Sequence, residues 1–256
     1  MSKNWPQGSQ DYIEQLKALG KVLARNPTLG NSSDGHMFRA FGGELFRVAN
    51  TALGFNGGRA TISTEPNLVF QAQLDKGLPK EGHAEIVIGG TSRFSDGTLS
   101  EQAIHFLILF TPSADVNGLQ ANTKYIVRKV HFDLDRQNTH MGKPTSHMQV
   151  GGNISHQMIA HTGDPERVKR ETFDQLDLPR IPSPPYGLAS VIDMALREFA
   201  PPSLKELTGE RSWNELVSQT ETVLLSSYHG RLYDELKSRA SRTNYAYHCE
   251  DIICDI

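Results

Sequence analysis

The stretch from residue 68 to residue 150 limits the fold most strongly, because apolar and polar residues alternate through several of its short segments. A period of two is typical of a β-strand with one buried face. The segment AIHFLILF is apolar on both faces, as in a central strand. Turn-rich connections between the segments favour antiparallel neighbours. The alternation predicts five strands, at 68–74, 83–90, 103–110, 124–135 and 145–150.

Apolar residues at both ends of the chain recur at helical spacing. A first helix is expected from Asp11, with Glu14 completing a capping box, and a second over about residues 38–52. Three helical stretches follow the proline-rich segment 178–187, and the last is expected to begin at Ser212. The predicted class is α+β, with an antiparallel sheet of about five strands flanked by N-terminal and C-terminal helices.

The length and the apolar segments bear on domains and location. A chain of 256 residues is long enough for one large domain, so residues 1–256 are expected to form one. The alternative is a helix–sheet part, 1–178, and a helical part, 179–256. The start of the chain does not resemble a signal peptide, and the longest apolar run, 106–110, is too short for a bilayer. We therefore expect a cytoplasmic protein without a membrane partner.

The charge balance bears on the class of ligand. The formal net charge is −3, which does not indicate a general nucleic-acid binder, although a local basic patch would still permit a nucleic acid or nucleotide partner. The glycine patterns of dinucleotide-binding and phosphate-binding loops are absent from the sequence, as is the G-x-S-x-G of serine hydrolases. Any chemistry must therefore come from another pattern.

Histidines are concentrated in one segment, since five of the ten fall within residues 131–161. Alternation within two expected strands gathers polar residues on one face of each strand. Their members are Lys129, His131, Asp133, Asp135, His147 and Gln149. If the two strands pair as antiparallel neighbours, opposed Cβ atoms lie about 5 Å apart. These side chains can then form one patch.

This patch suits acid–base chemistry or metal binding. His131 and His147 would be the acid and base or the metal ligands, and Asp133 would orient or ligate. Two histidines and a carboxylate are a known set for zinc or non-haem iron, so a divalent metal is a candidate cofactor of unknown identity.

Binding roles follow for the neighbouring polar residues. Arg128 or Lys129 would neutralise a phosphate, and Asp135 and Gln149 would add binding contacts. These roles predict a hydrolase of phosphodiesters or nucleotides. Two alternatives stay open: the face binds a small ligand without turnover, or it is the ordinary wet side of a sheet.

The segments FDLD, PTSHMQVGG, RIP and ASVIDMALREF resemble a pattern in bacterial proteins of a domain-of-unknown-function family. In that family an F-D-x-D strand precedes a P-x-x-H strand ending in glycines, and the resemblance covers roughly residues 125–200. It implies a bacterial or phage-related origin among mobile-element or defence loci. It also marks Asp133, Asp135 and His147 as matched motif positions, but it supplies no mechanism.

The expected last helix offers a non-enzymatic alternative. Its apolar stripe could dock a protein partner or form a homodimer, as in an adaptor or sensor subunit of a multi-protein defence system. Packing of the stripe on the protein's own core is the other reading. The stripe consists of Trp213, Val217, Leu224, Tyr228 and Leu232.

Overall fold

A computed structural model of the chain describes residues 7–54, 59–73, 80–95, 98–136, 145–151, 168–169 and 181–242. The helical elements are α1 (Gln7–Arg25), η1 (Pro27–Leu29), α2 (Ser33–Gly54), α4 (Leu188–Phe199), α5 (Pro202–Lys205), η4 (Glu206–Gly209) and α6 (Arg211–Arg242). The strands are β1 (Arg59–Ser63), β2 (Leu68–Ala72), β3 (Gly82–Ser95), β4 (Thr98–Pro112), β5 (Lys124–Asp135), β6 (Ser146–Val150), β7 (Val168–Lys169) and β8 (Ile181–Pro182).

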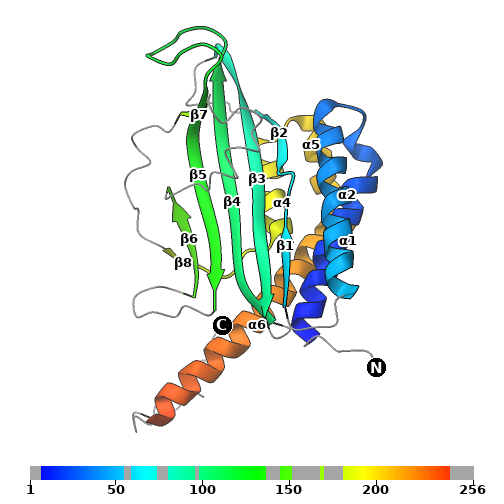
Figure 1. Ribbon diagram of the computed structural model, residues 1–256, viewed down its shortest axis with the longest axis vertical. Helices are drawn as coiled ribbons and strands as arrows, with labels where there is room; N and C mark the ends of the chain where they lie inside the picture. Colours follow the sequence, from blue (N-terminus) through cyan, green and yellow to red (C-terminus); the bar gives the residue numbers. More distant parts are fainter. Residues whose placement is uncertain are drawn as a thin grey trace.

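The described strands form one sheet in the order β1-β3-β4-β5-β6-β8, as Figure 1 shows. β2 also pairs with β3, on the same edge as β1 but along a different part of the strand, and β7 pairs with β5. Every pairing is antiparallel except the short parallel contact of β7 with β5. The predicted α+β class with an antiparallel sheet between N-terminal and C-terminal helices is confirmed.

All five expected strands are present, as β2 to β6, and three further short strands extend the sheet. β7 and β8 have two residues each, which is too short for an alternation of apolar and polar residues to predict them. β1 has five residues and only one of them, Ile62, is fully buried. These strands owe their pairing to neighbours that are distant in sequence, which a local pattern does not contain.

Two of the expected capping boxes do not lie at the helix starts that the structure shows. α1 begins at Gln7, so Asp11 lies within the helix rather than at its cap. α6 begins at Arg211, which makes Ser212 a helical residue, and Glu215 pairs instead with Arg211 through a 2.6 Å hydrogen bond. The capping-box pattern also fits ordinary positions on a helix surface, where polar residues four apart form i,i+4 pairs.

The helices lie against one face of the sheet, which we call the inner face (Figure 1). A single large apolar cluster joins this face to the helices of both chain ends. It includes Leu16 of α1, Phe41 of α2, Ile88 of β3, Ile192 of α4 and Trp213 of α6, each at most 2% exposed. The opposite, outer face carries a separate buried cluster of Val87, Leu107, Leu109 and Ile126.

α1 and α2 cross at a point where their backbones touch. A Cβ added at Gly42 would lie 2.6 Å from the backbone nitrogen of Ala24 and 2.7 Å from the carbonyl oxygen of Gly20. A Cβ added at the neighbouring Gly43 would meet nothing within 4 Å. Gly42 is therefore required by the close approach of the two helices, whereas Gly43 is not.

Candidate functional site: a histidine face on the sheet

The pairing of β4, β5 and β6 brings polar residues together on the outer face. In the register, His131 lies between His105 of β4 and Gln149 of β6. Asp133, two residues further along β5, lies opposite His147. Lys129 lies two residues before His131 on the same side of the strand. We call this set the histidine face: His105, Lys129, His131, Asp133, His147 and Gln149.

Four of the six residues of the histidine face are buried, unlike those on the wet side of an ordinary sheet. The exposed fraction is 1% for His147, 2% for Lys129, 7% for His131 and 8% for Gln149. The Asp133 side chain is 26% exposed. Moving an ammonium group and imidazoles out of water costs free energy unless other groups compensate. Burial of so many polar groups is therefore a reason to look for function here.

His105 and His131 contact each other directly. Their ring centroids are 4.4 Å apart and the rings are nearly perpendicular, at 86°. The Nδ1 of His105 and the Nε2 of His131 are both buried, and neither has a hydrogen-bond partner within the described ranges. Two buried ring nitrogen atoms able to accept or donate a proton thus belong to neighbouring imidazoles.

The environment favours the neutral form of both rings. Burial, together with the nearby His105, Lys129 and His147, lowers the pKa of His131 to about 3. Burial also lowers the pKa of His105. An imidazole that stays neutral at ordinary pH can accept a proton, so His131 has the protonation state of a general base.

His147 and Asp133 form the second functional pair. The Nε2 of His147 lies 3.5 Å from Oδ2 of Asp133, which is within ion-pair distance when the ring is protonated. A carboxylate beside an imidazole orients the ring and stabilises its cationic form. The pair therefore has the composition of a general acid, next to the neutral His131.

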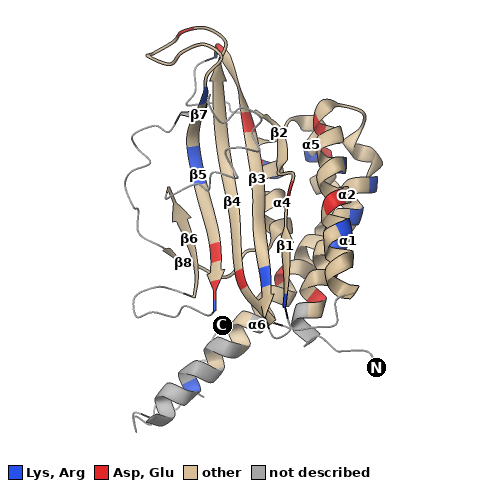
Figure 2. Ribbon diagram, viewed as in Figure 1, with Lys and Arg blue, Asp and Glu red and all other residues tan. Residues whose placement is uncertain are grey.

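Two expected binding residues lie apart from this set. Arg128 is exposed, and its guanidinium donates to the carbonyl oxygen of Val127. Arg128 pairs with Ile108 and precedes Lys129 directly in β5. It therefore points to the opposite side of the strand from Lys129. Asp135 lies at the end of β5 opposite Glu101, four residues beyond His131. Figure 2 shows basic residues in the middle of β5 and acidic ones at its end.

A metal site finds no support in the part of the chain that the structure describes. No group of three or more His, Cys, Asp or Glu side chains there could hold a metal ion. His147 and Asp133 are close, but their partner on β5, His131, contacts His105 instead. The other clustered histidines and both cysteines lie outside the described residues, namely His140, His156, His161, Cys249 and Cys254.

The sequence pattern did not reveal His105. It lies within the apolar segment of β4, where a single histidine is most simply explained as a core residue. A signal was nevertheless present, because His105 falls in the alternate register from Ile104 and Phe106, which point to the helices. Only the register between β4 and β5 shows that it meets His131.

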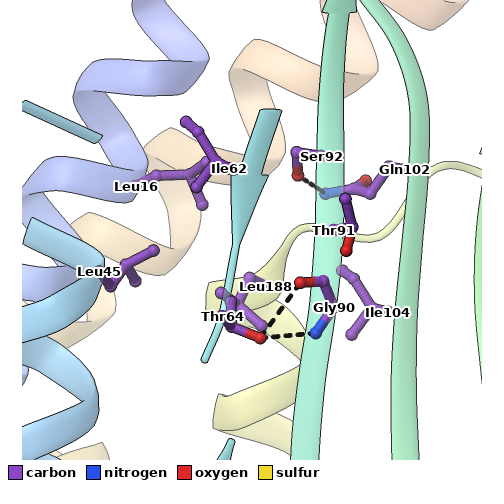
Figure 3. Close-up of a pocket in the computed structure, with 10 residues that line it drawn as sticks. All are labelled: Leu16, Leu45, Ile62, Thr64, Gly90, Thr91, Ser92, Gln102, Ile104 and Leu188. Carbon is purple, nitrogen blue, oxygen red and sulfur yellow. Dashed lines mark hydrogen bonds between the residues drawn. The ribbon is translucent and has the colours of Figure 1, made fainter. Parts of the chain in front are cut away.

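A second buried polar group lies between the sheet and the helices (Figure 3). The Gln102 side-chain amide donates to the hydroxyl of Tyr12 and lies 3.4 Å from the Ser92 hydroxyl. The Thr64 hydroxyl accepts a 2.6 Å hydrogen bond from the amide of Gly90. The adjoining cavity has room for about one water molecule. Its size suits a structural role.

Comparison of the chain with protein-family models, with curated proteins and with solved structures finds no match. Within the described ranges, no helix combines the length and apolar character needed to cross a membrane. The fold and the site define an α+β protein with a buried cluster of histidines on the sheet face away from its helices. Function is inferred from the chemistry of that cluster.

Proposed function

We propose that the protein is a hydrolase that cleaves a phosphodiester or a nucleotide at the histidine face. The observation that carries the proposal is the burial, on two adjacent strands, of a neutral imidazole beside an imidazole–carboxylate pair and a lysine. A general base, a general acid and a cation are the groups that metal-free cleavage of a phosphate ester requires. The resemblance to proteins of mobile-element or defence loci suggests a toxin or defence effector.

The roles follow from the environments of the side chains. His131 removes a proton from a water molecule, whose oxygen forms a bond to phosphorus. His147, held by Asp133, donates a proton to the oxygen that leaves as the other P–O bond breaks. Lys129 and the amide of Gln149 offset the charge on the phosphoryl oxygens. Both histidines are restored when His131 passes its proton to solvent and His147 regains one.

The test is an assay with bis(p-nitrophenyl) phosphate and a panel of cyclic and linear nucleotides. His131→Gln and His147→Gln should each lower kcat/KM by about a hundredfold to ten-thousandfold, the usual contribution of general acid–base catalysis. His83→Gln is the matched control, because His83 is exposed at the start of β3. Undiminished hydrolysis in a folded His131→Gln, His147→Gln double variant would contradict the proposal.

An adaptor or sensor role is a second candidate, and it concerns the end of α6. The first part of the expected docking stripe packs into the protein's own core, since Trp213, Val217 and Leu224 are buried. The end of α6 extends beyond the rest of the molecule (Figure 1), and Tyr233 on it is 55% exposed. This end is where a protein partner or a second copy would bind.

Light scattering tests the second candidate. A homodimer through α6 should become monomeric on Tyr233→Glu, since the substitution places a charge where an apolar contact is expected. A chain that is monomeric at high concentration, and that retains no partner from its own cells, would contradict it.

A further inference from the structure

We propose that the histidine face takes up one proton, shared by His105 and His131, when it binds a phosphate group. This inference rests on the proposed function for its class of ligand. It adds a residue, His105, and a dependence of binding on pH. It does not depend on cleavage of the bound phosphate group; for cleavage, the shared proton must lie on His105 so that His131 can act as the base.

The charges around the two rings provide the first reason. β5 places Lys129 and Asp133 on either side of His131, β6 supplies His147, and β3 presents Gly89, without a side chain, beside His105. With His105 and His131 neutral, the positive charges are those of Lys129 and of His147 when it acts as the acid, and Asp133 offsets one of them. A proton on the His105–His131 pair adds a further positive charge, which strengthens the hydrogen bonds to a dianionic phosphate group.

Charged residues further along the outer face do not change this balance in favour of an anion. Lys124 pairs with Glu85 at 2.6 Å, and Arg93 pairs with Glu101 at 2.7 Å. Asp135 lies opposite Glu101 in the register. Among the described residues of this face, the two ion pairs are neutral and add no positive charge for an anion, so there the added positive charge comes from the histidines.

The geometry of the two rings explains why they share a single proton. The Nε2 of His131 and the Nδ1 of His105 are buried without hydrogen-bond partners among the described residues, so both can respond to a ligand. The ring centroids are 4.4 Å apart. Two positive charges at that separation would repel each other strongly in a buried site, so protonation of one ring disfavours protonation of the other.

The protonation of the face therefore depends on what it binds. Burial favours the neutral form of both rings, and it lowers the pKa of His131 to about 3. A bound dianion favours the charged form of a neighbouring imidazole. Binding that adds one proton must strengthen as the pH falls, by up to about tenfold for each pH unit.

Calorimetric titration with sulfate tests the linkage. Sulfate resembles a phosphate group but stays a dianion across the pH range of the experiment, so every proton counted is taken up by the protein and none by the ligand. The heat of binding at one pH, measured in buffers of different ionisation enthalpy, gives the number of protons taken up. We expect close to one proton near pH 6, and tighter binding near pH 6 than near pH 8.

Matched variants locate the proton. His131→Gln and His105→Gln should each lower the uptake by at least half and flatten the pH dependence, while His83→Gln should leave both unchanged. Circular dichroism establishes that each variant is folded. For the unaltered chain, the ¹⁵N shifts of its imidazoles should move toward those of an imidazolium on addition of sulfate, which provides a readout without any variant.

The failures are distinguishable. Sulfate that binds without proton uptake would overturn the linkage and leave the proposed hydrolase untouched. Sulfate that does not bind at the histidine face would overturn both the linkage and the phosphate-group ligand on which the proposed function depends. Proton uptake that persists in the His105→Gln, His131→Gln double variant would assign the proton to another group. It would contradict the proposal that His105 and His131 share it.

Discussion

His131 differs from an exposed histidine because folding removes its ring from water and places it beside other basic groups. Its pKa falls from 6.5 to about 3, so the folded state favours the neutral ring. Such a group contributes stability above its unfolded pKa, and this contribution is lost as the pH falls toward the folded value. The histidine face therefore makes the fold sensitive to acid.

His131→Gln removes that sensitivity. Between about pH 7 and pH 5, the variant should lose roughly 2 kcal/mol less free energy of unfolding than the unaltered protein does. Urea unfolding at the two pH values measures the difference. Equal losses in both proteins would show that the ring of His131 is protonated without cost in the folded state.

Tyr12 provides the alkaline counterpart on the inner face. Burial raises its pKa from 10.0 to about 12, although hydrogen bonds from Gln102, the Leu188 backbone and Ser92 act in the opposite direction. The neutral hydroxyl thus contributes stability that is complete below pH 10 and is lost as the pH rises toward 12. The pH dependence of this contribution is opposite to that of His131, whose contribution to stability is lost as the pH falls.

Tyr12→Phe should show two effects. Near neutral pH it should lower the free energy of unfolding by about 1–3 kcal/mol, because the Gln102 amide loses a buried partner. Above about pH 10 its stability should decline less steeply than that of the unaltered chain. Chemical denaturation from neutral to alkaline pH measures both, and parallel curves would argue against the raised pKa.

At the scale of elements, the crossing of α1 and α2 gives a matched pair of substitutions on adjacent residues. Gly42→Ala places a methyl group against the backbone of α1 and should cost about 1–3 kcal/mol. Gly43→Ala meets open space and should stabilise the helix by up to about 1 kcal/mol. Thermal unfolding of the two variants tests the contrast, and equal effects would contradict the close crossing.

The elements also show what a single sequence can predict. Alternation of apolar and polar residues predicted β2, β3, β5 and β6, and a run apolar on both faces predicted β4; β5 and β6 pair as antiparallel neighbours, as expected. Neither pattern could predict β7 or β8, which exist through pairing alone. The face shared by His131, Asp133 and His147 followed from the same alternation. Their burial and the contact with His105 depend on the position of β4, which no local pattern contains.

At the scale of the whole molecule, the N-terminal helices, the sheet and the C-terminal helices contribute to one apolar cluster. Trp213 is fully buried in it and donates a 2.7 Å hydrogen bond to Asp193 of α4. Asn26 and Thr28, near the start of the chain, donate to the carboxylate of Glu210 just before α6. Such shared contacts favour cooperative unfolding.

Cooperative unfolding is a testable expectation. With Trp5 replaced by phenylalanine, tryptophan fluorescence reports Trp213 alone, since the chain has two tryptophans. Its denaturant midpoint should coincide with that of the far-ultraviolet circular dichroism, which reports the sheet and all the helices. Separate midpoints would favour the division of the chain into 1–178 and 179–256.

One irregularity in the register has a consequence for the two halves of β5. β4 pairs Ile108 with Arg128 but Leu109 with Ile126, so β5 carries one extra residue there. Alternation restarts at that point, which returns Ile126 to the side of Lys129 and sends Arg128 away. The bulge therefore divides β5 into two halves with different registers, and the half that carries His131 keeps its orientation through its own pairing with β4 and β6.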